Sequence, residues 1–225
     1  MKSRAAIFAN IRKSLRVGGD DRLRHETITA RIEKHPRGII PARGQKPDRE
    51  RLELFRQMVE SAKASIVMLE NKDDVPPAVA AYLRSKNLPQ SIRHGDDERL
   101  SLIPWAKERT LEVTKGASDG AQLASVSYSF GAVAESGTLV MVSGADNPTT
   151  LNFLPDHHLI VVDERDIAGD YESVWDRIRV SFGANKMPRA VNWITGPSRS
   201  GDIEQTHLLG AHGPRSLHVL VVRNS

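Results

Sequence analysis

The feature that most constrains the fold is a series of short, continuous apolar runs separated by segments with helical periodicity. The clearest run is "LIVV" within residues 158–163, and "LVMV" within residues 135–143 is similar. Strands buried on both faces have this character, whereas half-exposed strands alternate apolar and polar residues. Because helical segments lie between the runs, the pattern predicts βαβ units, which form a parallel sheet covered by helices on both faces.

The boundaries of the expected elements follow from this periodicity and from the glycine, proline and capping residues between the segments. We expect strands at residues 65–69, 91–93, 110–116, 135–143, 158–163, 190–196 and 216–222. We expect helices at residues 3–16, 21–34, 48–62, 76–87, 118–126, 171–182 and 201–209.

The amino-terminal segment differs from the rest of the chain in charge. Residues 1–50 carry thirteen Lys/Arg against six Asp/Glu, which leaves a net charge of −3 on the other 175 residues of a chain whose total is +4. Residues 35–47, "HPRGIIPARGQKP", read as a linker because they hold three prolines and two glycines. We therefore expect a basic helical extension and linker at 1–47 and an α/β domain at 48–225.

Composition excludes several classes of site. The chain has no cysteine, so disulfides, iron–sulfur ligation, zinc–thiolate sites and cysteine nucleophiles are all excluded. No apolar run approaches 18 residues, so no membrane span is expected. The basic extension has no aromatic or helix–turn–helix pattern of a nucleic-acid module, and we expect no nucleic-acid partner. A transit peptide and a basic amphipathic helix both explain the first residues, and we expect a cytoplasmic protein.

The segment "GPSRSGDIE", residues 196–204, concentrates polar side chains where a strand should give way to a helix. A serine could cap that helix, and acids in its first turn would suit the helix dipole. The same N–H groups and hydroxyls could instead hold a carboxylate or phosphate. Both interpretations stay open. The candidate ligand-binding residues here are Gly196, Ser198, Arg199, Ser200, Asp202 and Glu204.

A second candidate lies at the entry to the strand at 135–143. Glu135 precedes a run that should be buried, and a buried carboxylate needs a partner or a raised pKa. Gly137 permits a bend and a close approach to the backbone. Glu135 is the tentative catalytic residue, and Ser136, Gly137 and Thr138 are candidate ligand-binding residues. We expect both candidates to form one pocket, in which Glu135 converges with Ser198 and Ser200. This requires the strand that starts near residue 135 to lie close to the strand that ends at residue 196.

The remaining polar positions are weaker candidates. Asn147 lies in the turn after this strand and is included as a candidate ligand-binding residue. Asp163, at the end of its strand, is expected to be a solvated acid. The eight histidines show no spacing that gathers three or four metal ligands, so we expect neither a metal nor a cofactor.

Several stretches together resemble the lactate utilization protein C family, the LUD-domain proteins. Four elements carry the resemblance. The first is Ala-Glu-Ser-Gly-Thr at Ala134–Thr138, and the second begins with Gly-Pro-Ser at Gly196–Glu204. The third is Gly-x-His-Gly-Pro at Gly210–Pro214, and the fourth is the final apolar strand at Leu217–Val222. Ser136 stands where threonine is common, and Ser200 and Gly201 replace a usual Thr-Ala. The hydroxyls survive both serine changes.

The resemblance implies a three-layer α/β/α sandwich like that of the NagB/RpiA/CoA-transferase group. It implies a subunit of a system that oxidises L-lactate to pyruvate, which binds a small carboxylate or iron–sulfur partner proteins. The alternative is an enzyme of acyl or CoA transfer type with Glu135 as nucleophile, since a carboxylate can attack an acyl group. Whether the chain is an enzyme stays open.

Overall fold

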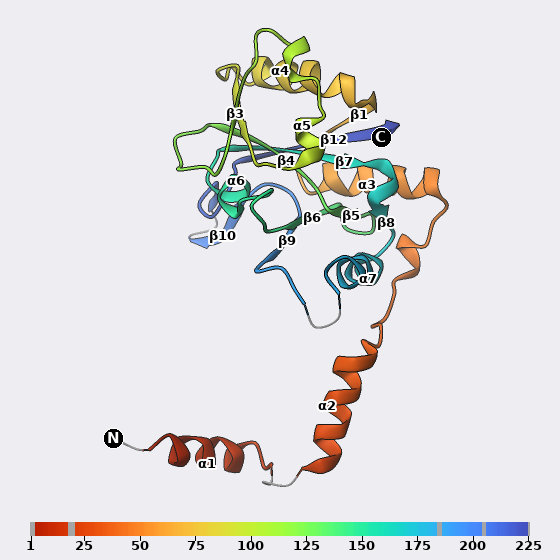
Figure 1. The fold of residues 1–225 in the computed structure, drawn as a ribbon, viewed down its shortest axis with the longest axis vertical. Coiled ribbons are helices and arrows are strands. Elements are labelled where there is room, and N and C mark those ends of the chain that lie inside the picture. The colour runs from red at the N-terminus through yellow and green to blue at the C-terminus, as the bar shows by residue number, and fades with distance from the viewer. Residues whose placement is uncertain (1–2, 18–20, 184–185, 204–205, 225) are drawn as a thin grey trace. The chain divides into compact units, whose positions relative to one another are not determined.

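The computed structural model describes residues 3–17, 21–183, 186–203 and 206–224, and the side chains of 201–203, 206–209 and 224 lie outside that description (Figure 1). Two compact units make up the chain, Met1–Ile39 and Ile40–Ser225. Residues 40–47 pack with the larger unit. The expected division of the chain at 47/48 into an extension and a LUD domain stays a prediction.

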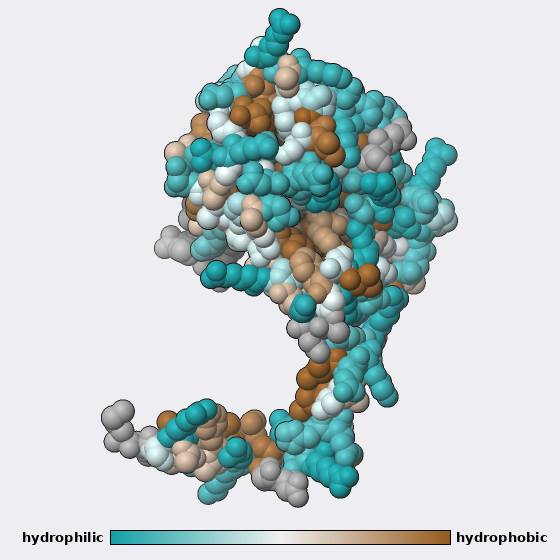
Figure 2. Space-filling view, in the orientation of Figure 1, coloured by the Kyte–Doolittle hydropathy of each residue, from teal (hydrophilic) through white to brown (hydrophobic). Residues whose placement is uncertain are grey.

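The amino-terminal unit consists of the two predicted helices, α1 (Arg4–Ser14) and α2 (Arg22–Lys34). Ser3 caps α1 by accepting a hydrogen bond from the Ala6 N–H. Figure 2 shows hydrophobic surface on both helices, and the exposed apolar side chains are Ile7, Phe8, Ile11, Leu15, Leu23, Ile28 and Ile32. No helix among the described residues is both long and apolar enough to cross a membrane.

The larger unit is built on a six-stranded sheet, here called the main sheet, in the described part of the chain. All of its strand pairs are parallel. In spatial order the strands are β1 (Ser65–Asn71), β12 (Ser216–Asn224), β7 (His157–Asp163), β4 (Ala124–Tyr128), β2 (Ser91–His94) and β3 (Glu112–Lys115). The predicted parallel sheet is confirmed.

Both faces of the main sheet are covered, which explains its continuous apolar strands. On β7, Leu159 and Val161 pack toward α4 (Val75–Ser85), with α5 (Glu98–Ser101) on the same face. Ile160 and Val162 point to the opposite face, where they meet Phe55 of α3 (Asp48–Ser61). Figure 1 shows α4 and α3 on opposite sides of the sheet. The predicted three-layer α/β/α arrangement is therefore confirmed.

A second, smaller sheet was not expected. It comprises β8 (Ile167–Ala168), β5 (Gly131–Val133), β6 (Thr138–Val142) and β9 (Val191–Ile194), and β6 is antiparallel to both β5 and β9. One face shares a core with α3, and the other packs against α7 (Tyr171–Phe182) through residues such as Val140 and Ile178. The small sheet is thus enclosed as well, so its strands carry the same continuous apolar signature.

The remaining described elements are short connections. They are α6 (Thr149–Phe153) and the 3₁₀ turns η1 (Ala42–Gly44), η2 (Lys72–Asp74), η3 (Trp105–Lys107) and η4 (Glu164–Asp166).

Two predicted helices were wrong. Residues 118–126 form a loop and the start of β4. In the segment predicted as a helix at 201–209, the described residues belong to two antiparallel strands, β10 (Arg199–Ile203) and β11 (Thr206–Leu209). Gly201 weakens a helix, while the β-branched Ile203 and Thr206, which pair with each other, favour strands. Asp202 therefore lies in a strand and not in the first turn of a helix, and its side chain and all of Glu204 are outside the described residues.

Two glycines allow the carboxyl-terminal end of α3 to pack closely on the small sheet. Gly137 has φ +68°, and a Cβ there would lie 2.6 Å from the Val59 nitrogen and 2.7 Å from the Met58 carbonyl carbon. Gly196 has φ +74°, and a Cβ there would overlap the Ala62 carbonyl oxygen. We expected the lack of a side chain at Gly137 to allow a ligand close to the backbone. In the structure the helix α3 occupies that space.

We expect Gly137→Ala to lower the free energy of unfolding by about 2–4 kcal/mol, because it adds a backbone clash to a left-handed conformation. Gly120→Ala is the matched control. Gly120 also has a positive φ, +94°, but a Cβ there meets nothing within 4 Å. Urea unfolding should show that the control loses only about 1–2 kcal/mol; equal losses in the two variants would contradict the packing argument.

Candidate functional site

Glu135 lies in the tight turn that joins β5 to β6. Its side chain is 3 % exposed, and its carboxylate Oε2 is 3.4 Å from Nε of Arg43, whose own side chain is 66 % exposed. The Glu135 N–H donates to the carbonyl of Gly169 at 3.2 Å. The sequence-based requirement for a partner is met, because an arginine from outside the small sheet supplies the opposite charge.

The segment that brings Arg43 to this carboxylate is held by a contact between two glycines. A Cβ on Gly44 would overlap the Gly169 carbonyl and lie 3.3 Å from the Glu135 Cβ, and a Cβ on Gly169 would overlap the Gly44 carbonyl. Next to this contact, Gln45 donates to the Asp170 carboxylate at 2.9 Å. Residues 43–45 therefore cover Glu135, and no larger side chain fits at either glycine without movement of the backbone.

A cluster of hydroxyl groups follows Glu135. Thr138 Oγ1 lies 2.7 Å from Ser136 Oγ, 2.8 Å from Tyr171 Oη and 2.6 Å from Thr195 Oγ1, and the Tyr171 hydroxyl donates to Ser136 Oγ at 2.9 Å. Strand pairing causes this convergence, because Leu139 of β6 lies opposite Ile194 of β9. Thr138 is fully buried, whereas Thr195 is exposed, so the cluster runs from the interior to solvent.

Two members of this cluster, Tyr171 and Thr195, were missed from the sequence. Tyr171 opens α7 after the capping residue Asp170, and Thr195 directly precedes Gly196. Thr195 could have been found, since it belongs to the same polar stretch as the serines. Tyr171 carried no signal beyond its place at the start of a helix.

The residues after Gly196 contact a different set of neighbours. The Ser198 N–H donates to the Pro214 carbonyl at 2.8 Å, the Ser198 hydroxyl accepts from the His212 N–H at 3.3 Å, and the Arg199 guanidinium donates to the Ala62 carbonyl. The described contacts thus join Ser136 and Thr138 to Thr195, and join Ser198 to the 210–214 turn. The single shared pocket of Glu135, Ser198 and Ser200 stays a prediction.

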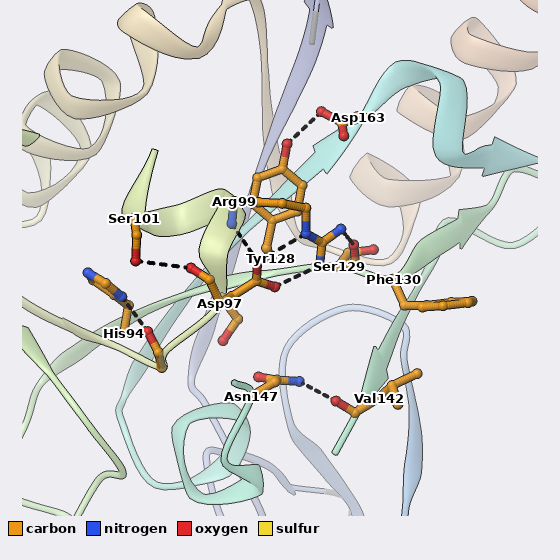
Figure 3. A network of polar contacts seen from close by, with 12 residues as sticks. His94, Asp97, Arg99, Ser101, Tyr128, Ser129, Phe130, Val142, Asn147 and Asp163 are labelled. Atoms are coloured by element: carbon orange, nitrogen blue, oxygen red, sulfur yellow. Dashed lines mark hydrogen bonds and ion pairs between the residues drawn. The ribbon is translucent and has the colours of Figure 1, made fainter. Parts of the chain in front are cut away.

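Asn147 is buried, and its amide donates to the Val142 carbonyl at 3.0 Å, which closes the turn after β6 (Figure 3). Its amide thus satisfies a backbone group within its own turn. Ligand binding by Asn147 stays a prediction.

A polar network occupies the carboxyl ends of β2, β4 and β7 (Figure 3). The Arg99 guanidinium bonds both Asp97 oxygens, at 3.0 and 2.7 Å, and lies 4.1 Å from the centre of the Tyr128 ring. The Tyr128 hydroxyl donates to Asp163 at 2.5 Å. Burial and the Asp163 carboxylate raise the pKa of Tyr128. Asp163 is 2 % exposed, so the expectation of a solvated acid was wrong.

A hollow lies at the carboxyl ends of β1, β12 and β7, where parallel α/β sheets place their ligands. Two adjoining hollows of about 760 and 460 Å³ share Arg51, Arg165 and Ile167, and we call them the arginine groove. Among the described residues that line it, the cations are Lys46, Arg49, Arg51, Arg165, Arg177 and Arg223, and the acids are Asp48, Glu70, Glu164 and Asp170.

The arginine groove adjoins the covered glutamate. Gly44 and Gly169, which contact Glu135, also line the smaller hollow. Arg51 is anchored by Asp48 at 2.8 Å, whereas Arg165 is 67 % exposed and lies 3.6 Å from Asp163. Other cations of the groove are also ion-paired: Lys46 with Glu50, Arg177 with Asp166 and Arg223 with Glu70. Cations still outnumber acids among the described residues that line the groove, and none of its arginines had a recognisable sequence pattern.

A separate buried polar cluster lies under α6. The Ser127 hydroxyl is 3.0 Å from Nε2 of His158 and donates to the Asn152 carbonyl oxygen at 3.3 Å. Burial lowers the pKa of His158 to about 3. His158 is fully buried, so this imidazole is neutral at physiological pH and acts as part of the core.

Comparison with known proteins places the chain in a family. The LUD domain sequence profile matches residues 52–222. The chain belongs to the LUD domain family. An uncharacterized protein of Neisseria meningitidis serogroup B is 30% identical over 145 residues, which are 62% of this chain and 61% of that protein. Lactate utilization protein C of Bacillus subtilis is 34% identical over 105 residues, which are 45% of this chain and 44% of the relative.

The shared region is only part of each curated relative, since these matches span about half of their length. Among solved structures, a DUF162 family protein from Deinococcus radiodurans superposes on this LUD domain with a TM-score of 0.59. At 22% identity it covers 79% of this chain and 99% of its own. This likeness supports the fold described above.

The buried His158 predicts a pH dependence of stability. Its folded pKa lies below the unfolded value of about 6.5, so the unfolded chain binds more protons and stability falls as pH drops below 6.5. His158→Gln should therefore make the free energy of unfolding less steep between pH 4.5 and 6, by about 1.4 kcal/mol per pH unit. Ser61→Ala, at an exposed position with no titratable group, is the control and should leave the slope unchanged. An unchanged slope in His158→Gln would contradict the assignment.

Proposed function

We propose that this chain takes part in L-lactate utilization as a subunit of a cytoplasmic system that oxidises lactate to pyruvate, and that it binds a small carboxylate in the arginine groove. The observation that carries the binding proposal is the hollow of about 460 Å³ lined by Arg51, Arg165 and Arg177, whose lining residues Gly44 and Gly169 also contact Glu135. The lactate assignment is supported by membership of the LUD family and by relatives named lactate utilization protein C.

The chemistry of the groove suits a carboxylate with a neighbouring hydroxyl. Arginine binds carboxylates through two parallel N–H···O bonds, which fix orientation as well as charge. Arg51 is held by Asp48 on the first turn of α3 and is therefore positioned before a ligand arrives. Gln45, whose amide already bonds Asp170, lies at the edge where a substrate hydroxyl would sit.

Titration calorimetry of the full chain with L-lactate, pyruvate and acetate tests this proposal. Arg51→Met should weaken lactate binding about tenfold or more, because it removes a charge-assisted hydrogen-bond donor. Arg56→Met is the matched control: Arg56 lies on the same helix, bonds Glu53 and Glu60, and does not line the groove. An equal effect of both variants, or no heat of binding with any acid, would contradict the groove assignment.

Acyl transfer with Glu135 as nucleophile remains the other function considered from the sequence. The 3 % exposure of this carboxylate and the cover provided by residues 43–45 mean that an acyl-CoA would have to displace this segment. The geometry therefore favours carboxylate binding. A covalent CoA adduct trapped on Glu135 by mass spectrometry would reverse this preference.

The basic helices α1 and α2 offer a surface for a partner in the proposed system. Deletion of residues 1–39, a separate compact unit, should leave lactate binding intact and abolish co-purification with iron–sulfur proteins of lactate oxidation. Pull-down with the full chain and the truncated chain measures this. Partner binding that survives the deletion would place the contact on the larger unit.

A further inference from the structure

A small pocket opens at the amino ends of β1 and β12, the edge opposite the arginine groove. It has a volume of about 240 Å³, and we call it the amino-end pocket; the residues that define it are Lys63, Ser65, Tyr82, Lys86, Arg215 and Ser216. Its walls come from the loop after α3, from the carboxyl end of α4 and from the start of β12. The volume suits a small ligand and is too small for a nucleotide or coenzyme.

The charge of this pocket is one-sided. Three of its described lining residues, Lys63, Lys86 and Arg215, are cationic, and none is acidic. The Asp156 carboxylate is 3.3 Å from Arg215 Nε and offsets part of one of these charges. Two serines also line the pocket, and the Ser65 hydroxyl contacts His218 Nδ1 and the Leu217 carbonyl. The pocket thus presents cationic donors from separate segments around one small space. Such a set suits an oxyanion with several oxygens.

Two histidines lie behind the pocket and respond to its charge. His218 Nδ1 is 2.7 Å from Ser65 Oγ, the His218 ring stacks on Tyr82 with centroids 4.4 Å apart, and the Tyr82 hydroxyl is 3.0 Å from His157 Nδ1. Burial, followed by the charge of Lys86, lowers the pKa of His218 to about 4. Burial and Lys86 also lower the pKa of His157, while the Asp156 carboxylate acts in the opposite direction.

The pocket borders the turns that carry the family resemblance. Arg199 donates to the carbonyl of Ala62, the residue before Lys63, and a Cβ on Gly210 would overlap the side chain of Arg215. The Gly-Pro-Ser and Gly-x-His-Gly-Pro elements therefore help to position the loops that supply two of the three cations.

We propose that the amino-end pocket binds a small oxyanion with two negative charges, namely a phosphate group of a small metabolite, between Lys63, Lys86 and Arg215. This inference is independent of the lactate proposal, because the two sites lie at opposite edges of the sheet. An anion bound beside Lys86 offsets the positive field at His218 and His157. Binding of the anion to the pocket and protonation of these two imidazoles therefore favour each other.

Inorganic phosphate, glycerol phosphate and sulfate are the probes, offered to the full chain at constant ionic strength. We expect saturable binding by calorimetry, and Lys86→Met should weaken it about tenfold or more. Arg215→Met is a second variant, which keeps the test valid if one replacement disturbs folding. Lys107→Met is the matched control, since Lys107 pairs with Asp73 near the carboxyl end of β1 and does not line the pocket.

Histidine titration by NMR locates the bound ion. Saturating sulfate, which stays doubly charged across the titration, should raise the pKa of His218 and His157 by roughly 0.5 unit. The proposal is overturned by a lack of saturable binding, by equal weakening in Lys107→Met, or by binding that leaves the pKa of both His218 and His157 unshifted. Lactate binding that persists in Lys86→Met would show that the two sites are separate.

Discussion

The close approach of α3 to the turns at Gly137 and Gly196 is the constraint on which the rest of the larger unit depends. The helix lies between the main sheet and the small sheet and fills both of their facing surfaces, through residues such as Phe55 and Val59. Its last turn fits only because two left-handed glycines leave the Met58–Ala62 backbone unobstructed. The position of α3 in turn determines both proposed binding sites. Arg51, near the start of α3, lines the arginine groove, and Lys63, just after its end, lines the amino-end pocket.

The parallel main sheet was predictable because its signal is local and strong. Strands such as β7 and β12 are enclosed on both faces, so each is a continuous apolar run bounded by polar residues. The small sheet gave the same signal for the same reason, and sequence alone could not separate the two. The strands β10 and β11 were mistaken for a helix because the serines and acids of this segment suit a helix start as well as a strand, and residue types alone did not reveal the pairing of Ile203 with Thr206.

The candidate site was predicted in part. Glu135 could be identified because a carboxylate at the entry to a buried strand requires a partner of opposite charge or a hydrogen bond. The predicted closeness of the strands β6 and β9 is confirmed by the pairing of Leu139 with Ile194. The partner Arg43 could not be predicted, since it comes 92 residues earlier in a stretch that reads as a linker. The arginines of the groove come from separate segments, and only the fold brings them together.

The contact between Gly44 and Gly169 carries a consequence for where the domain of this chain can be cut. The counter-ion of the buried glutamate belongs to a stretch that precedes residue 52, where the family match begins. A fragment cut to residues 52–222 would keep the acid and lose its arginine. The carboxylate would then be buried without the neutralising group, which lies just upstream of the matched region.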